Sequence, residues 1–345
     1  MAEADTQNWS NESDDVACPH LLDAIDAPLL VLRGTLILHA NGQARAILGA
    51  YIEGDDIRMA VRHPEAAALI ASGENGVASL GGLGDSERQW LLHVRHIDAR
   101  DRLLRLEDRS GQLASERMRT DFVANASHEL RTPLAAISGF IETLEEANGP
   151  ADGPLRTRFL GIMAQEARRM QRLIDDLMSL SRVEVDRYVR PNQTLDFAAA
   201  VATACAEIEA GGKADGRLAI TLAETPSILG DAAQISQVIH NVVGNGLKYG
   251  DPARPIEVVL DSAEGMARLT VTDHGEGIAP EHLPRLTERF YRIDAGRSRS
   301  VGGTGLGLAI VKHIVERHRG RLEISSGLGI GTRVVVLIPL AASEL

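Results

Sequence analysis

The feature that most restricts the fold is an apolar repeat within residues 113–147 that follows the spacing of a coiled coil. Apolar or small side chains recur there at alternating steps of four and three residues, which is a heptad pattern. They are Val123, Ser127, Leu130, Leu134, Ile137, Ile141 and Leu144. This seam predicts a long amphipathic helix that packs its apolar stripe against other helices.

A second amphipathic helix is predicted directly after the first. The segment Asn148–Pro154 is rich in Asn, Asp, Gly and Pro, which favours a turn between the two helices. The next helix carries its apolar residues on one side, namely Phe159, Ile162, Met170, Leu173, Leu177 and Leu180. A lone helical hairpin cannot bury two apolar seams. We therefore expect it to pair with a second copy, as a four-helix bundle in a homodimer.

The segment before the hairpin is typical of a small α+β module. Apolar runs on either side of Arg33-Gly34 predict two strands joined by a tight turn, within Pro28–His39. Further along, the pattern predicts helices at 43–48 and 64–70, a glycine-rich loop at Ser79–Gly84, and a second hairpin from strands at 89–96 and 103–107.

The segment after the hairpin is predicted to alternate strands with helices. Strands are expected at 256–260, 267–272, 322–324 and 333–338, and helices at 231–247 and 305–319. Twelve of the chain's 33 glycines fall between Gly265 and Gly331. Glycine gathered between strands and helices favours a mobile loop close to a phosphate-bearing ligand.

Charge and composition exclude several classes of function. The formal net charge of -12 argues against nucleic acid as a partner, because acidic surfaces repel phosphate backbones. Cys18 and Cys205 lie far apart without metal-ligand spacing, so they are expected to be reduced thiols. Residues 1–18 are predicted to form a disordered tail without a signal peptide. No apolar run reaches the ~18 residues that a transmembrane helix needs. The sequence thus predicts a cytoplasmic protein, while peripheral contact with a membrane stays open.

The octet Ser127–Leu134 lies beside the seam and carries reactive side chains. His128 follows a seam position, so its ring is expected to point partly to solvent, with Glu129 next to it. Thr132 lies one helical turn after His128 on the same face. Pro133 costs about 3 kcal/mol in a helix interior and kinks the helix. Such a cost beside an exposed imidazole indicates a functional site.

The octet resembles the phosphoacceptor box of bacterial sensor histidine kinases, and the resemblance covers nearly all of residues 110–340. Four further boxes of that family follow in its order. They are an asparagine box at Asn241–Tyr249, glycine boxes at Asp273–Gly277 and Gly302–Leu308, and a phenylalanine box at Glu288–Arg292. Any one could arise by chance, whereas five in order are very specific.

The resemblance implies a role for each residue of the octet. His128 would accept the γ-phosphoryl group of ATP, and Glu129 would act as general base or fix the ring tautomer. Thr132 would position a water molecule for the reverse, phosphatase reaction. The phosphoryl group would pass from His128 to an aspartate of a response regulator.

The remaining boxes imply a nucleotide site. Asn245 would bind Mg²⁺ with Asn241 assisting, since amide oxygens suit this ion. Lys248 can meet phosphate as a point charge, and Asp273 can accept a hydrogen bond from the adenine amine. The implied ATP-binding residues are Asn241, Asn245, Lys248, Tyr249, Asp273, Gly275, Gly277, Gly303, Thr304, Gly305, Leu306, Gly307 and Leu308. Gly275 and Gly277 would let the base approach. Arg297 and Arg299 are expected in a loop over the site, more often solvated than bound to phosphate.

Two positions depart from the family pattern, and both are glycine. Gly246 stands where Ala is usual and Gly250 where Ser or Thr is common, so both are expected to loosen the end of this helix, by about 1 kcal/mol for the first. The glycine loop lacks the spacing of a Walker A motif and of a dinucleotide fingerprint.

The N-terminal module resembles a PAS sensor domain in Asn41–Gly49. The segment Val61–Glu65 resembles phosphate-regulon sensor kinases. No cofactor is predicted for this module. Its histidines, His39, His63, His93 and His96, are expected to be solvated or part of the core rather than haem or metal ligands.

Taken together, the sequence predicts a multidomain α+β protein with a tail at 1–18, a PAS-like α/β sensor domain at 19–108, a dimeric helical hairpin at 109–188, and an α/β-sandwich ATP-binding domain of the gyrase, chaperone and histidine kinase type at 189–345. The predicted function is a homodimeric two-component histidine kinase.

Two alternatives stay open. A gyrase- or chaperone-like ATPase shares the nucleotide fold but has a carboxylate where Asn241 stands. A non-catalytic scaffold would not need Asn245 or Asp273.

Overall fold

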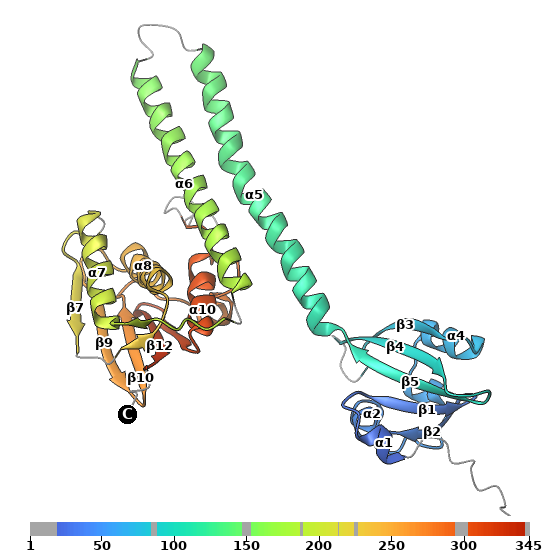
Figure 1. Ribbon diagram of the computed structural model, residues 1–345. Coiled ribbons are helices and arrows are strands. Elements are labelled where there is room, and N and C mark those ends of the chain that lie inside the picture. Colours follow the sequence, from blue (N-terminus) through green and yellow to red (C-terminus); the bar gives the residue numbers. More distant parts are fainter. Residues whose placement is uncertain are drawn as a thin grey trace, which may run out of the picture. The chain divides into compact units, whose positions relative to one another are not determined.

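The computed structural model describes residues 19–83, 88–146, 153–186, 189–212, 214–223, 227–293 and 303–341. Within the chain it separates two compact units, residues 1–121 and 122–345 (Figure 1). Several predictions concern positions outside the described residues. These are the tail with Cys18, most of the turn Asn148–Pro154, Gly302, and the arginines Arg297 and Arg299.

The first unit is built on a five-stranded antiparallel sheet with the strand order β2-β1-β5-β4-β3. Its elements follow in the order α1 (Pro19–Asp23), β1 (Leu29–Arg33), β2 (Leu36–Ala40), α2 (Gly42–Leu48), α3 (Ile57–Ala60), α4 (Pro64–Ser72), β3 (Gly76–Gly81), β4 (Gln89–His96) and β5 (Asp101–Asp108). The predicted α+β module, with both hairpins and the helices at 43–48 and 64–70, is confirmed. The strand β1, which lies between β2 and the central strand β5, has both of its faces buried. Leu30 and Leu32 join the main core, whereas Leu29 and Val31 pack with Leu22 of α1.

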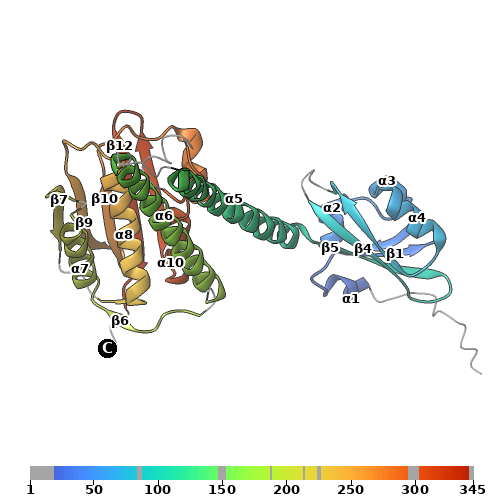
Figure 2. The ribbon, with the colours of Figure 1, turned by 90° about the horizontal axis from the view of Figure 1, so that it is seen from above.

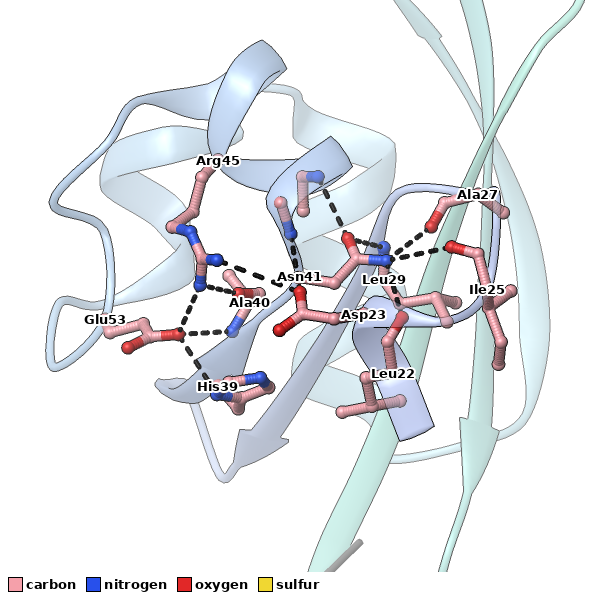
Figure 3. A network of polar contacts seen from close by, with 12 residues as sticks. Leu22, Asp23, Ile25, Ala27, Leu29, His39, Ala40, Asn41, Arg45 and Glu53 are labelled. Atoms are coloured by element: carbon pink, nitrogen blue, oxygen red, sulfur yellow. Dashed lines mark hydrogen bonds and ion pairs between the residues drawn. The ribbon is translucent and has the colours of Figure 1, made fainter. Parts of the chain in front are cut away.

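A single buried amide ties three elements of this unit together (Figure 3). Asn41, 1% exposed, accepts hydrogen bonds through Oδ1 from the backbone N–H groups of Leu29 and Ala44, both at 3.0 Å. Its Nδ2 donates to the carbonyl oxygens of Leu22 at 3.0 Å and Ala27 at 2.7 Å. Asn41 thus caps α2 and fixes the end of α1 against β1, which satisfies a polar group that would be costly to bury alone.

The predicted loop at Ser79–Gly84 is wrong for its first half. Residues Gly76–Gly81 form β3, which pairs with β4 from Gly76 opposite Val94 to Gly81 opposite Gln89. Ala78 and Leu80 alternate inward and are buried, so burial of these two side chains outweighs the low strand propensity of the glycines. Gly82 then leaves the strand at φ +78°.

The helical hairpin is formed by α5 (Ser110–Glu146) and α6 (Gly153–Val185). Figures 1 and 2 show the two helices side by side, and the rings of Phe140 and Phe159 lie 4.9 Å apart between them. The helix α5 continues through Pro133, which is buried. The predicted apolar side of α6 is confirmed, since Leu173 and Leu180 are buried.

Part of the predicted seam stays exposed in the single chain. On α5, Val123 is 57% and Leu134 54% exposed, while Leu130, Ile137 and Leu144 are half-buried. On α6, other apolar residues are exposed, namely Leu160, Ile174 and Met178. Each helix therefore packs some apolar side chains against its neighbour and leaves others exposed to solvent in the single chain.

The rest of the second unit is a two-layer α/β domain. Its elements are β6 (Thr194–Leu195), α7 (Phe197–Ala210), β7 (Leu218–Leu222), β8 (Ile228–Leu229), α8 (Ala232–Tyr249), β9 (Ile256–Ala263), β10 (Met266–Thr272), the 3-10 helix η2 (Pro280–Arg285), α10 (Gly307–Arg317), β11 (Arg321–Gly327) and β12 (Gly331–Pro339). The main sheet has the order β11-β12-β10-β9-β7, in which only the pair β7–β9 is parallel. The four predicted strands and two predicted helices are confirmed.

The sequence reasoning did not include α7 or β7. The helix α7 is rich in alanine, so its apolar face is hard to distinguish by periodicity, yet Phe197, Val201 and Cys205 are fully buried. Its start does carry a signal, because Asp196 Oδ1 accepts a hydrogen bond from the N–H of Ala199 at 2.9 Å as an N-cap. Burial raises the pKa of the Cys205 thiol to about 11.

A buried histidine joins the ends of two helices in this domain. The Nδ1–H of His318, 1% exposed, donates to the carbonyl of Ile314 at 2.8 Å, and its Nε2 accepts from the N–H of Asp231 at 3.1 Å. These two bonds fit the neutral ring. Burial lowers the pKa of His318, with a smaller contribution from Arg317.

We expect this histidine to make the domain less stable in mild acid. The unfolded chain takes up a proton at a pKa near 6.5, and the folded chain does so only at lower pH, so stability is lost as the pH falls below about 6.5. Urea unfolding of the wild-type chain and of His318→Asn between pH 7.5 and 5.5 measures this. The variant should be less stable throughout but with a smaller loss on acidification. An equal loss in both proteins would contradict this explanation.

None of the helices in the described part of the chain combines the length and the apolar character needed to cross a membrane.

Candidate functional site

The octet lies on α5 with His128 exposed, as predicted. The hydroxyl of Ser127 donates to the carbonyl of Val123 at 2.8 Å, and that of Thr132 donates to the carbonyl of His128 at 3.3 Å. Thr132 is therefore tied to the backbone one turn back, beside the position where Pro133 lacks an N–H. Its hydroxyl oxygen keeps a lone pair that can still accept a hydrogen bond from water.

Glu129, the predicted general base, is paired with two arginines from different elements. Arg169 of α6 donates through Nη2 to Glu129 Oε2 at 3.2 Å. Arg292 of the phenylalanine box approaches the same oxygen, with its Nη1 at 3.8 Å. Both arginine side chains are largely buried, at 13% and 10% exposed. In this arrangement the carboxylate is engaged by cations as well as being next to His128.

A cavity of about 360 Å³ lies beside the phosphoacceptor box. It is lined by Asn125, His128, Glu129, Arg285, Glu288, Arg289, Phe290 and Tyr291. The ring centres of Phe290 and Phe122 lie 5.9 Å apart, and the Arg289 guanidinium lies 5.4 Å from the centre of the Phe122 ring. The structure thus brings the octet together with the phenylalanine box.

The asparagine box occupies the second half of α8. This helix is capped by Asp231, which accepts from the N–H groups of Ala233 and Gln234. Asn241 and Asn245 lie one turn apart and are half-buried. The Nδ2 of Asn241 is buried without a hydrogen-bond partner among the described residues. Such an amide is poised for an additional ligand, because unpaired buried polar groups are unfavourable.

Asp273 follows β10 and is 8% exposed. Its Oδ1 accepts hydrogen bonds from the N–H groups of Gly275 at 2.9 Å and Thr332 at 3.1 Å. These bonds hold the carboxylate in a fixed orientation.

The two glycines after Asp273 are packed closely against the protein backbone. We expected Gly275 and Gly277 to make room for an adenine base. A Cβ at Gly275 would instead collide with the carbonyl oxygen of Tyr249, and one at Gly277, which has φ +73°, with that of Gly327. The contacts that require glycine at these positions are therefore with the protein backbone.

The second glycine box lies next to both the asparagine box and the phenylalanine box. A Cβ at Gly303 would lie 2.6 Å from Lys248 Nζ, and one at Gly307 would lie 3.3 Å from Asn241 Oδ1. Gly305, at φ +74°, accepts a hydrogen bond from the N–H of Phe290 at 2.9 Å. Leu306 is buried, whereas Leu308 is half-buried at the start of α10. Lys248 Nζ also lies 4.7 Å from the ring centre of Tyr249.

Gly246 and Gly250, which were predicted to loosen the end of α8, lie where a larger residue would meet close neighbours. A Cβ at Gly250 would lie 2.6 Å from the carbonyl oxygen of Gly246 and 2.8 Å from Ile256 Cδ1. At Gly246 the Cβ would lie 3.1 Å from Ile256 Cγ2. Both glycines allow the end of α8 to approach β9 closely, so here the lost helix propensity accompanies tight packing.

Sequence reasoning missed the hairpin residues that contact the ATPase-type domain. Asp176 Oδ2 accepts a hydrogen bond from the Thr304 hydroxyl at 2.7 Å, and Glu184 pairs with Arg289. Burial raises the pKa of Asp176, and the bond from Thr304 opposes this shift. The sequence did carry one signal for this contact, because Asp176 stands on the apolar side of α6 near Leu173 and Leu177.

Two family models match the chain in the order that this geometry requires. Residues 118–185 match the His Kinase A (phospho-acceptor) domain, and residues 230–342 match the Histidine kinase-, DNA gyrase B-, and HSP90-like ATPase domain. The chain belongs to the sensor histidine kinases. The ATPase match also supports the use of ATP.

Two similar proteins are sensor kinases as well. The chain is 41% identical over 241 residues to the phosphate regulon sensor protein PhoR of Pseudomonas aeruginosa, covering 70% of this chain and 54% of PhoR. It is 35% identical over 241 residues to the sensor protein kinase WalK of Staphylococcus aureus, covering 69% of this chain and 58% of that protein. The chain thus spans somewhat more than half the length of these two relatives.

A solved structure of a kinase with its partner has the same fold. The histidine kinase ThkA, crystallised in complex with the response regulator TrrA, aligns with a TM-score of 0.51. The alignment covers 94% of this chain and 99% of that one at 16% identity. At this identity the likeness concerns the fold alone.

Proposed function

We propose that this chain is a sensor histidine kinase that transfers the γ-phosphoryl group of ATP to His128 and then to an aspartate of a response regulator. The observation that carries the proposal is the exposed His128 of a phosphoacceptor domain on the same chain as an ATPase domain with Asn241, Asn245 and Asp273. In the transfer, a nitrogen of the imidazole bonds to the γ-phosphorus, the bond to the bridging oxygen breaks, and ADP leaves. Glu129 takes the ring proton or fixes the tautomer.

The transfer requires the ATPase domain to move relative to the hairpin. In the described arrangement His128 faces the phenylalanine box. Arg292 belongs to the ATPase domain and is paired with Glu129 in the described arrangement, so this movement must also separate the two side chains. Positioning and electrostatic stabilisation carry most of phosphoryl transfer, so His128 must reach an in-line position next to the γ-phosphate.

The nucleotide roles are assigned residue by residue. Asp273 would accept a hydrogen bond from the adenine amine, and Lys248 would meet the phosphates. Asn245 would bind Mg²⁺ through its amide oxygen, and the orphan amide of Asn241 would assist. When bound, Mg²⁺ would neutralise charge on the transferring phosphates. Tyr249 and residues 303–308 would line the remaining site.

We further propose a homodimer with domains at 19–108, 109–188 and 189–345. The exposed apolar side chains of both hairpin helices, such as Val123, Leu134, Ile174 and Met178, support a second copy of the hairpin as the partner. The first module would be a PAS-like sensor without an assigned ligand. A cytoplasmic location and the absence of nucleic acid from the partners stay predictions.

The likeness to PhoR supports a role in phosphate-regulon signalling, and a panel of purified response regulators tests it. Labelled kinase should transfer its label to the phosphate-responsive regulator within seconds and to the others far more slowly. Equal or faster transfer to another regulator would assign the chain to that regulator's system.

Incubation with γ-labelled ATP and Mg²⁺ tests the activity itself. A histidine kinase should acquire label that is lost in acid and kept in alkali. A gyrase- or chaperone-like ATPase would release phosphate without labelled protein, and a scaffold would do neither. A gel of acid- and alkali-treated samples, beside a phosphate-release assay, separates the three.

We expect Thr132→Ala to keep kinase activity and to weaken dephosphorylation of the regulator by about 100-fold. The hydroxyl lies one turn after His128, where it can orient water toward a phosphoryl group. It is not needed when the imidazole attacks ATP. Thr132→Ser is the matched control, because it keeps the hydroxyl. The measurement is a pair of rates from one preparation, namely label gained by His128 and label lost from the regulator. A parallel fall of both rates would leave Thr132 only its bond to the His128 carbonyl.

A further inference from the structure

Two carboxylates of α6 hold side chains of the ATPase domain, one in the second glycine box and one in the phenylalanine box. Asp176 Oδ2 accepts the Thr304 hydroxyl at 2.7 Å, and Glu184 pairs with Arg289. Around these polar contacts the helix is packed into the domain, as Figures 1 and 2 show for α6 beside α10. Leu180 and Val183 are 0% and 1% exposed there. The hairpin is therefore docked through both an apolar strip and specific acidic side chains.

Thr304 lies where the hairpin and the nucleotide site meet. Its neighbours on the chain, Gly303 and Gly305, contact Lys248 and Phe290. Its Oγ1 accepts the N–H of Leu306 at 3.3 Å while its hydrogen is given to Asp176. A hydroxyl has one proton to donate, so Thr304 cannot donate to Asp176 and to a phosphate oxygen at the same time.

Asp176 is suited to act in place of a phosphate. Its carboxylate is an anionic oxygen acceptor, as a phosphate is, and it is largely withdrawn from solvent by the packing of α6. Asp175 and Arg172, the charged groups that act on the pKa of Asp176, both lie on its own helix. Among the described residues, its hydrogen-bond donor from the ATPase domain is Thr304.

We propose that Asp176 is a competitor for the nucleotide built into the hairpin. It holds Thr304 when the site is empty, and a bound nucleoside triphosphate takes Thr304 away from it. This inference rests on the proposed function. By linkage, docking of the hairpin weakens nucleotide binding, and nucleotide binding weakens docking by the same factor. Nucleotide binding thus releases the ATPase domain from the hairpin, which is the movement that transfer to His128 requires.

The test is calorimetric titration of the full chain with Mg²⁺ and a non-hydrolysable ATP analogue. Asp176→Ala should bind the analogue about 5- to 10-fold more tightly than the wild type, which lies at the low end of typical coupling between sites. Asp175→Ala, the neighbouring exposed carboxylate, is the control and should bind as the wild type does. Asp176→Asn keeps an oxygen for the Thr304 hydroxyl and should lie between the two.

The outcomes separate this inference from the proposed function. If the wild type binds no analogue, the proposed nucleotide site fails. If the wild type binds the analogue, and Asp176→Ala and Asp176→Asn bind it as well as the wild type does or more weakly, the proposed competition is wrong while the proposed function stands. Thermal melting shows that each variant is folded. In the wild type, saturating analogue should also increase hydrogen exchange in residues 173–183, and unchanged exchange there would equally overturn the proposal.

Discussion

Replacing His128 with alanine is expected to abolish acid-labile labelling, by at least about 1,000-fold, and to leave nucleotide affinity unchanged. The imidazole of His128 is the proposed nucleophile, so the variant lacks the nitrogen that would form the phosphoramidate. His128 lies on the hairpin, whereas the proposed nucleotide contacts lie on α8, after β10 and in the second glycine box. Labelling with γ-labelled ATP and titration with an ATP analogue on the same preparations measure both quantities.

His20→Ala is the control for that experiment. His20 is an exposed histidine of α1 in the first unit, and its loss should change neither labelling nor affinity. Acid-labile label that persists in His128→Ala would show that another histidine accepts the phosphoryl group. A loss of nucleotide affinity in that variant would mean that His128 supports the ATPase domain.

Asp273→Asn is expected to weaken ATP binding by about 100-fold while the domain stays folded. The asparagine keeps Oδ1, which the N–H groups of Gly275 and Thr332 need as an acceptor. It replaces the second oxygen by an amide that donates, so the adenine amine loses its partner, and a buried unpaired donor costs about 1–3 kcal/mol. Calorimetry with ATP and a thermal melt are the measurements. Wild-type affinity in the folded variant would refute the adenine assignment.

Asn245→Ala provides the contrast. It should keep most of its affinity for ATP measured with EDTA present, and lose the gain in affinity that Mg²⁺ gives the wild type, together with phosphoryl transfer. The expectation follows from the amide oxygen of Asn245 as the proposed Mg²⁺ ligand. If the variant responds to Mg²⁺ as the wild type does, another side chain holds the ion.

The elements with a strong period could be predicted from the sequence. The heptad spacing from Val123 to Leu144 predicted α5, and alternation predicted β10 and β12, because the apolar residues in each recur with the period of one helix or strand face. The helix α7 was missed because Ala198, Ala199 and Ala200 blur the contrast between its faces. The strand β3 was missed because its glycines resemble a loop, while pairing with β4 and burial of Leu80 decide its structure.

The composition of the site was predictable, whereas its partners were not. His128, Asn241, Asn245 and Asp273 stand in local motifs, and the resemblance of five such motifs in order to the family pattern singled them out. The contacts of Glu129 with Arg169 and Arg292 join residues 40 and 163 positions apart, and nothing in the spacing announces them. The same holds for Asp176 with Thr304, which are brought together by the packing of α6 on α10. Long-range pairs of this kind depend on how the elements dock.

The most direct test of the central claim is to locate the phosphoryl group on the chain. After incubation with ATP and Mg²⁺, trypsin at alkaline pH releases the peptide Thr120–Arg131. This peptide contains a single histidine, His128, and two hydroxyl residues, Thr120 and Ser127. Fragment spectra of this peptide identify the modified residue. The phosphoryl group should be on His128, and the same treatment should give much less of it in the Asp273→Asn protein. A phosphoryl group on Ser127, on Thr120 or on a different peptide would contradict the assignment of His128 as the phosphoacceptor.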